Sequence, residues 1–394
     1  MGTFGARPAE TPRVTVAAPP IRPLAILVGT VALLETLLLS ALSPLLPQFE
    51  ELLDLSKAQV GLLNAAYPLG TFIVAVPAAL LVARIGIRSA VAGALVLLAC
   101  STVALGLLDS YPGLVVARFL QGAAGGGIAW PLATAWLTSE TPPGRRGRVL
   151  GGVIGISIFG ATLGPVLGAV ATASRPATFL ALAAVVCGAL VLLARLQSPP
   201  ILHASGLGAL RRALTNRAVL LGLWFVIIPG ALFGMLGTLL PLQLDRLDVG
   251  PAGIAAVFVV SAALGAGVTT LTGRIVDRRG RIAPLRVAVV LSPIAAVVLP
   301  LLEQPLLVAI WAVIGIGVWD IFWPPAMALL ADGAEEVQVE QTFAFALQAM
   351  AWGPGAFLGS VGGGVLAEMA GDVVAWSVMG AVCALSLPLL RRRG

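Results

Sequence analysis

Charged side chains are scarce in this sequence, and lysine, histidine and tyrosine are nearly missing. Only 11% of the 394 residues are charged, whereas a soluble domain carries roughly a quarter, and 59% are apolar. The mean hydropathy is correspondingly high, at +1.01. No soluble fold can bury that much apolar surface, so the composition indicates an integral membrane protein.

The few cysteines and the single histidine argue against metal and redox sites. Cys100, Cys187 and Cys383 lie far apart, each inside an apolar block, and are interpreted as small core residues. His203 cannot complete a metal site with them. The only lysine, Lys57, follows a serine instead of the glycine of a phosphate-binding loop. We therefore expect no metal, no cofactor and no ATP-driven transport. An enzyme is not expected either, because no nucleophile and base stand together.

Apolar blocks of about 18 to 25 residues recur along the chain, and about 20 helical residues cross the ~30 Å hydrocarbon layer of a bilayer. The blocks lack two-residue alternation, which excludes a β-barrel. We predict an all-α integral membrane protein with twelve transmembrane helices, at 24–46, 59–82, 90–108, 113–137, 149–172, 177–195, 219–241, 252–274, 285–302, 306–330, 342–366 and 373–390.

Polar segments divide this chain into two halves. Residues 1–22, rich in proline, alanine and arginine, are expected to form a disordered cytoplasmic tail. The first apolar block is too long for a signal-peptide core, so we expect it to stay in the mature protein. Residues 197–217 are expected to be a cytoplasmic linker between an N-terminal six-helix half, 23–196, and a C-terminal half, 218–394.

The basic residues predict the orientation. Twenty of the 24 fall in the tail or in connections on its side of the membrane, and Arg118 lies within a span. Only Lys57, Arg175 and Arg246 fall on the other side. The positive-inside rule then places both termini in the cytoplasm, for a multi-pass protein of the cell (inner or plasma) membrane. The same topology accounts for the basic charge, so we expect no nucleic-acid partner.

An internal repeat links the two halves. Leu-Leu-Pro at 45–47 recurs at 239–241, and Arg84-Ile85-Gly86 corresponds to Arg278-Arg279-Gly280, in each case 194 residues apart. Two parallel six-helix halves with a substrate held between them form a transporter architecture, in which the halves rock around a fixed site.

The segment 273–281, Gly-Arg-Ile-Val-Asp-Arg-Arg-Gly-Arg, resembles the loop motif of the major facilitator superfamily, and the resemblance covers nearly the whole chain. It implies two pseudo-symmetric six-helix bundles, the major facilitator fold. The motif's acid and arginines would form a charged latch at the helix ends. In the first half, 79–88, alanines replace the family's glycine and aspartate. The resemblance implies a cytoplasmic gate formed by Arg84, Gly86, Arg88, Gly273, Asp277, Arg278, Gly280 and Arg281.

Two further motifs lie in the fourth and fifth spans. Arg118 to Gly122 resembles the family's arginine motif, which is associated with proton coupling. The fifth span is similar to the signature of the antiporter branch. Its glycines would let that helix pack closely and its proline would permit a kink, whereas generic small-residue packing is the alternative. The expected helix pivot comprises Gly151, Gly160, Gly164, Pro165 and Gly168.

Glu35 and Arg118 are ionisable residues inside spans, where a charge costs at least ~2.5–3.5 kcal/mol. Glu35 lies about 18 Å from the cytoplasmic start of its span and Arg118 about 9 Å from the outer start of its own. Their depths nearly coincide in a ~30 Å layer. We therefore expect them to pair and protonation of Glu35 to break the pair. The alternative is a static ion pair that fixes helix packing.

Residues 35–47 are similar to the first span of drug:proton and vesicular amine antiporters, and Asp320 matches another acidic position of that branch. The resemblance implies proton coupling by Glu35, Arg118 and Asp320. Aromatic residues beside these acids would suit amphipathic or cationic organic molecules. Gln348 stands where the amine transporters have an acid, which argues against strong amine selectivity. The expected substrate cavity comprises Glu35, Gln121, Trp224, Phe233, Trp319, Asp320, Trp323 and Gln348.

These observations together favour proton-coupled efflux of small organic molecules by alternating access. Uptake by symport is the alternative within the fold, and a non-transporting membrane receptor is an alternative of another class. The expected partners are a small-molecule substrate, protons and the lipid bilayer, and we expect the protein to be a monomer.

Overall fold

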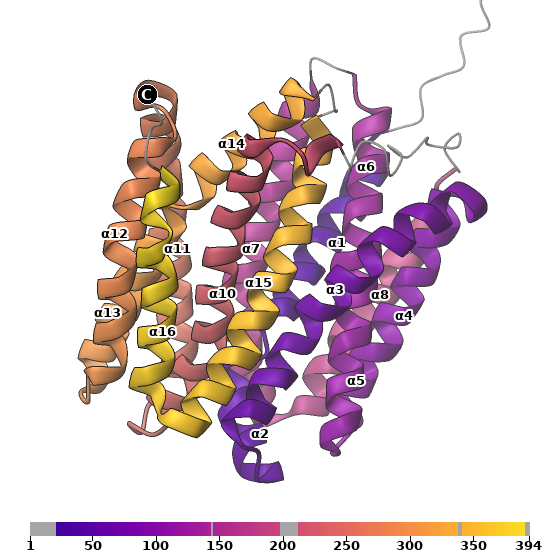
Figure 1. The fold of residues 1–394 in the computed structure, drawn as a ribbon. Helices are drawn as coiled ribbons and strands as arrows, with labels where there is room; N and C mark the ends of the chain where they lie inside the picture. Colours follow the sequence, from indigo (N-terminus) through magenta and orange to yellow (C-terminus); the bar gives the residue numbers. More distant parts are fainter. Residues whose placement is uncertain (1–20, 143–144, 198–211, 338–340, 391–394) are drawn as a thin grey trace, which may run out of the picture.

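The computed structural model describes residues 21–142, 145–197, 212–337 and 341–390. The expected tail, apart from Ile21 and Arg22, and most of the expected linker lie outside these ranges. Within them every regular element is a helix, and the chain crosses the bundle twelve times (Figure 1). The prediction of an all-α fold with twelve transmembrane helices is confirmed.

Six crossings come from each half of the chain. The N-terminal half consists of α1 (Ile21–Ser40), η1 (Ser43–Leu45), α2 (Leu46–Leu53), α3 (Lys57–Ile85), α4 (Ile87–Leu107), α5 (Tyr111–Gly122), η2 (Ala123–Ala129), α6 (Trp130–Glu140), α7 (Arg146–Ala173) and α8 (Arg175–Ala194). The C-terminal half consists of α10 (Arg217–Asp245), α11 (Pro251–Arg279), α12 (Ile282–Val298), η4 (Leu299–Leu301), α13 (Pro305–Asp320), α14 (Trp323–Glu336), α15 (Gln341–Ala370), α16 (Asp372–Leu385) and η5 (Leu387–Leu390).

Ten of these crossings are long and apolar enough by themselves to span a membrane. The other two are 111–140, which carries Arg118 next to a run of glycines, and α15, which is also rich in glycine. Glycine and polar residues lower the mean hydropathy of both segments. In the segment 111–140, neighbouring helices bind the most polar groups: Arg118 donates to α1 and Gln121 donates to α4.

The 194-residue repeat is present in the backbone. Among the described residues, two aspartates have a positive φ, Asp54 (49°) and Asp248 (59°), and they lie 194 positions apart. Gly86 and Gly280 are separated by the same interval and both have φ of 80°, a conformation that favours glycine. Each of these two glycines caps the end of one long helix, and the next helix begins within two residues, so both halves turn at the same places.

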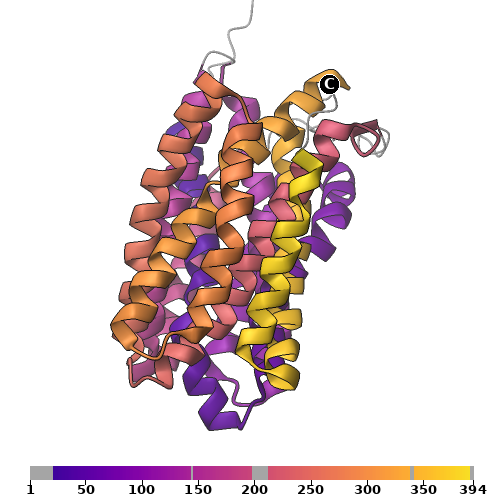
Figure 2. The same ribbon diagram turned by 60° about the vertical axis from the view of Figure 1, so that its left-hand side comes forward.

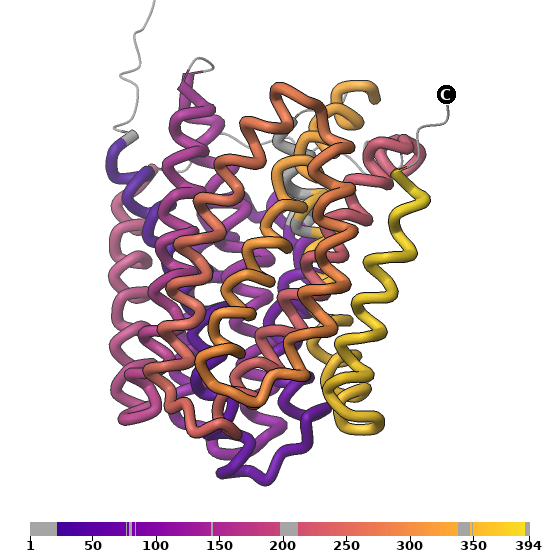
Figure 3. The backbone as a smooth tube through the Cα atoms, turned by 90° about the vertical axis from the view of Figure 1, so that its left-hand side faces the viewer, coloured from indigo at the N-terminus to yellow at the C-terminus, as the bar shows by residue number. Residues whose placement is uncertain are grey.

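Each half has its own hydrophobic core. One core is built from residues between Leu24 and Leu193, with Leu242 as the single contribution from the other half. The second core runs from Ala213 to Leu390. The helices of both halves run roughly side by side along one axis (Figure 2). The start of α1 and the end of η5 lie at one end of the bundle and α2 lies at the other, here called the α2 end (Figures 1 and 3).

The expected glycine stripe of α7 packs against α1. A Cβ atom at Gly164 would lie 2.6 Å from the carbonyl oxygen of Leu37, and one at Gly168 would lie 3.0 Å from Cδ of Pro44. Gly160 meets the backbone of α1 in the same way. Gly151 is different, because it is exposed and no atom lies within 4 Å of a Cβ there. Its inclusion in a packed pivot was wrong for this conformation.

The C-terminal half contains an equivalent stripe that was not predicted. Cβ atoms at Gly355, Gly359 and Gly363 of α15 would clash with Ile227, Ala231 and Met235 of α10. The residues they meet lie 194 positions after Leu33, Leu37 and Ala41, which meet the stripe of α7. The stripe is therefore an architectural feature of both halves, and by itself it does not identify an antiporter.

Replacing Gly164 with valine is expected to destabilise the protein, since overpacking a close helix contact costs about 1–3 kcal/mol. Gly164→Val should lower the thermal unfolding midpoint of the purified protein, measured by tryptophan fluorescence. Gly151→Val, on the same helix but in open space, is the matched control and should unfold near the parent temperature. Equal midpoints for the two variants would contradict the packing described here.

Candidate functional site

Helix α1 breaks in the interior of the bundle and exposes backbone carbonyls there. It ends at Ser40, and Pro44, which has no N–H to donate, opens the 3-10 turn η1. The last carbonyls of a helix lack partners within it. Arg118 of α5 uses two of them: Nη1 donates to the oxygen of Leu38 at 2.9 Å, and Nη2 donates to that of Leu39 at 3.3 Å.

Arg118 is completely buried and its position is fixed by further neighbours. Nη1 also donates to Oε1 of Gln121 at 2.7 Å, and Gln121 in turn donates to Thr102. The guanidinium lies over the ring of Tyr67, 4.7 Å from its centroid, in cation–π geometry. Gln121 therefore positions Arg118. Because Gln121 is fully buried, it does not line a cavity in this conformation, contrary to the expectation.

Glu35 and Arg118 come close in space but do not form the expected ion pair. Tyr67 lies between them: its ring contacts Arg118 and its hydroxyl donates to the backbone oxygen of Glu35 at 3.1 Å. The direct pair was wrong for this conformation, because backbone carbonyls and Gln121 take the two terminal nitrogens of the guanidinium, and Nε has no partner among the described residues. The side chain of Glu35 is 8% exposed and accepts no hydrogen bond from the described residues.

A glycine-rich π-helical segment surrounds the Glu35 carboxyl. In η2 a Cβ atom at Gly126 would lie 3.1 Å from Oε1 of Glu35 and 2.6 Å from Oγ1 of Thr71, and one at Gly125 would lie 2.9 Å from the Tyr67 hydroxyl. Single π turns inside α-helices often occur at functional sites. Sequence reasoning missed this element, although three successive glycines, Gly125 to Gly127, in the middle of a span were a visible signal.

Asp320, the second expected proton-coupling acid, lies in the C-terminal half, apart from Glu35. It ends α13 at the break before α14, and its carboxylate is pressed against α11 at Gly265, where a side chain would clash with it. It is partly buried and makes no hydrogen bond or ion pair with the described residues. The proton-coupling roles of Glu35, Arg118 and Asp320 stay predictions.

The aromatic residues expected to line the substrate cavity pack on the C-terminal core. Trp319 is fully buried, stacked on Trp376 at 5.9 Å and in edge contact with Phe233 at 6.2 Å. Trp224 packs on the same core and donates to Ser386 of the last transmembrane helix. Trp319, being fully buried, does not line a cavity in this conformation, whereas the assignment of the partly buried Trp224 and Phe233 to the cavity stays a prediction. Trp323 also packs on that core, and Gln348 is partly buried without a hydrogen bond among the described residues.

The expected cytoplasmic gate residues lie at the end opposite α2 and form no bond between the halves within the described residues. Arg281 pairs with Asp332, both in the C-terminal half, and Arg88 donates to the oxygen of Ala194, both in the N-terminal half. Asp277 is exposed and makes no ion pair with a described residue. Gly86 and Gly280 form the turns described above, whereas Gly273 is partly buried, and Arg84 and Arg278 are exposed.

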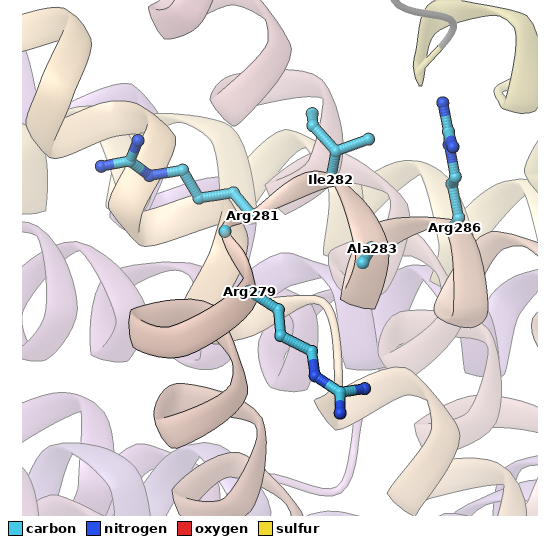
Figure 4. Close-up of a pocket in the computed structure, with 6 residues that line it drawn as sticks. Arg279, Arg281, Ile282, Ala283 and Arg286 are labelled. Carbon is cyan, nitrogen blue, oxygen red and sulfur yellow. The ribbon is translucent and has the colours of Figure 1, made fainter.

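A cavity of about 230 Å³ lies at the turn between α11 and α12 (Figure 4). Its arginines point in different directions in Figure 4. Arg281 is paired with Asp332, and Arg286 donates to the oxygen of Leu390 at 2.9 Å. Only Arg279 is left without such a partner among the described residues, so this cavity is not a converging substrate site.

Polar contacts between the halves gather at the α2 end. In the described residues every side-chain hydrogen bond between the halves involves the first eight residues of α3. Asn64 donates to Thr238 at 3.1 Å and to Ser360 at 3.3 Å, joining α3 to α10 and α15. Sequence reasoning missed these residues, because nothing in their spacing shows that they meet.

Comparison with known proteins agrees with this architecture. Curated relatives from Salmonella typhimurium and Salmonella typhi, described as uncharacterized MFS-type transporter YcaD, are 26% identical over 316 residues, covering 78% of this chain and 80% of theirs. A D-xylose-proton symporter structure superposes with a TM-score of 0.74 at 15% identity, covering 94% of this chain and 97% of its own.

Another structural match is a bacterial homolog of the human lysosomal transporter Spinster, inward-facing and unoccupied, with a TM-score of 0.70 at 14% identity and 94% of each chain covered. At such identities these structures show the fold alone. The sequence model of the Major Facilitator Superfamily matches residues 28–336. With twelve helices in two repeated halves, this chain belongs to the Major Facilitator Superfamily, whose members are multi-pass membrane transporters.

Proposed function

We propose that this protein is a proton-coupled secondary transporter in which Glu35 carries the proton. The observation that supports this is a buried carboxyl whose basic neighbour, Arg118, is already bound to backbone carbonyls. An ionised carboxylate inside a membrane is costly unless it is paired or reaches water. A carboxyl without a fixed partner can therefore bind a proton while closed off and release it when water enters.

The surroundings of Glu35 suit such an exchange. Tyr67 holds the backbone of Glu35 and stacks on Arg118, so a change at the carboxyl reaches both helices α3 and α5. The glycines of η2 let the carboxyl and Thr71 lie close to the backbone of the fourth span. Proton loading at this point would thus act on the crossing of α1, α3 and the fourth span.

The sides of the membrane follow from the arginines. The positive-inside rule places the chain ends in the cytoplasm and the α2 end outside. The side-chain hydrogen bonds between the halves gather at the α2 end in the described residues. With this orientation, the conformation of the structure would be closed to the outside and would face inward. The exposed Asp277 fits this state, because a latch at the cytoplasmic end would be released.

Efflux by antiport is the direction we propose, with small amphipathic or cationic organic molecules as substrates. The likeness of the first span to drug:proton antiporters supports this direction. The glycine stripe of α7 does not support it, because the same stripe occurs in α15. Symport is the second candidate, since one of the structural matches is a D-xylose-proton symporter and a carboxylate can couple flux in either direction.

The Glu35→Gln variant is expected to lose proton-driven flux. A proton moving down ~100 mV supplies about 2.3 kcal/mol, enough for a gradient of tens-fold. Inverted vesicles with an acidic lumen should accumulate members of a panel of dyes and organic cations, and Glu35→Gln should abolish the accumulation. Glu303→Gln, which changes an exposed carboxylate, is the control and should behave like the parent. Unchanged accumulation in Glu35→Gln would exclude the proton-carrying role.

The direction of coupling is tested in the same vesicles and in right-side-out vesicles. Antiport predicts accumulation in inverted vesicles with an acidic lumen. Symport predicts accumulation in right-side-out vesicles with an acidic exterior, and that result would replace efflux by uptake.

Arg118→Lys is expected to impair both stability and transport, although it conserves the charge. Lysine lacks the planar fork that reaches two carbonyls and Gln121 together, and each buried polar group left without a partner costs about 1–3 kcal/mol. The unfolding midpoint and the flux should both fall, whereas Arg148→Lys, at an exposed position, should change neither. A fully active and stable Arg118→Lys protein would show that only the charge matters.

A further inference from the structure

The N-terminus of α3 is held by two acids of the α15–α16 hairpin. Glu368 accepts a hydrogen bond from the backbone N–H of Ala58 at 3.0 Å, in the first turn of α3. An acid is favourable there because the N-terminus of a helix carries a partial positive charge. Asp372, at the start of α16, receives Nζ of Lys57 at 2.6 Å. Both contacts join the two halves of the protein.

The carboxylate of Asp372 is shared by two cations from different halves. Its second oxygen receives Nη2 of Arg246, also at 2.6 Å, and Arg246 belongs to the C-terminal half together with Asp372. Lys57 belongs to the N-terminal half. Because one carboxylate holds both, the two cations are close neighbours, and without it they would repel each other across the boundary.

Lys57, Arg246, Glu368 and Asp372 form a charged layer at the α2 end. Beneath this charged layer, small and neutral residues bring the helices of the two halves into close contact. A Cβ atom at Gly364 would lie 2.5 Å from the carbonyl oxygen of Lys57, and one at Gly61 would lie 3.2 Å from the carbonyl carbon of Ser360. The hydrogen bonds of Asn64 follow one turn further in. Thr238, which accepts one of these bonds, is fully buried.

The charged layer is not a product of the repeat. Position 251, which corresponds to Lys57 at the 194-residue interval, is Pro251, and position 178, which corresponds to Asp372, is Thr178. The positive-inside rule does not explain the charged layer either. The layer lies at the α2 end, which is the end of the bundle with few basic residues. The two halves therefore share a repeated backbone, but the charged layer is present at only one end of the bundle.

We propose that Lys57, Arg246, Glu368 and Asp372 form an electrostatic clasp that keeps the α2 end closed and must break before this end can open. The clasp rests on the alternating-access function proposed above. Its strength sets the fraction of molecules open at the α2 end. Asp372 is its centre, because its loss removes the ion pair of Lys57 with the other half and leaves Lys57 and Arg246 as two like charges facing each other.

The test measures opening directly and needs neither substrate nor a proton gradient. The three native cysteines are replaced by alanine, and Thr238→Cys places a thiol beneath the clasp. A membrane-impermeant maleimide is added to right-side-out and to inverted vesicles, and the labelling rate is compared with and without Asp372→Asn. Asp109→Asn is the matched control, since Asp109 forms its ion pair with Arg175 within the N-terminal half.

Asp372→Asn is expected to raise the labelling rate about fivefold, as for a shift of about 1 kcal/mol between two states. Lys57→Gln should raise it less, since it leaves no unpaired like charges, and Asp109→Asn should leave it unchanged. The proposal is overturned if Asp372→Asn labels at the parent rate, if Asp109→Asn has an equal effect, or if Lys57→Gln exceeds Asp372→Asn.

Two further measurements keep the result unambiguous. The unfolding midpoint shows whether Asp372→Asn is folded, and if it is not, Glu368→Gln is tested against the same control. Labelling in inverted instead of right-side-out vesicles would reverse the proposed sidedness without affecting the clasp. Loss of proton coupling in the flux assays likewise leaves the labelling result intact, so failure of the proposed function and failure of the clasp are distinguishable.

Discussion

Direct contact between helix backbones, possible only where glycine leaves out a side chain, is the interaction on which both halves depend. Gly164 brings α7 onto α1, and Gly359 brings α15 onto α10. Helices this close can share polar groups. Ser40 of α1 donates to the carbonyl of Ala161 in α7, which Pro165, without an N–H, leaves free. In a membrane such contacts replace the water that would otherwise satisfy the backbone.

The shortage of hydrogen-bond partners inside a membrane also explains the arrangement of the Glu35 site. Pro44 ends α1 early, and the carbonyls of Leu38 and Leu39 that are left over hold Arg118. Once the guanidinium is bound to backbone, Glu35 has no counter-ion among the residues that the structure describes. A buried acid without a partner is costly in a static protein, and this cost is consistent with the proposal that Glu35 changes its protonation state.

The two halves are alike in backbone and different in charge. Turns at Gly86 and Gly280 and the two glycine stripes follow the repeat. The buried arginine and the clasp around Asp372 do not. A symmetric frame permits opening at either end with similar packing, and unequal charges then decide which end is closed. In this conformation the side-chain hydrogen bonds between the halves that the described residues form lie at the α2 end.

The sequence by itself determined the twelve helices, the repeat and the similar level of Glu35 and Arg118 in the bundle, because hydropathy, spacing and helical rise are local properties. It indicated the stripe of α7, and the same four-residue spacing of glycines in α15 was overlooked, while the partner helix of each stripe, more than a hundred positions earlier, was known only from the packing. Only the tertiary structure decided that Arg118 binds carbonyls instead of Glu35 and that Trp319 belongs to a core. It also decided that Lys57 meets Asp372, 315 residues away. Which side chains share a partner depends on how helices cross, and that is fixed by packing over the whole chain.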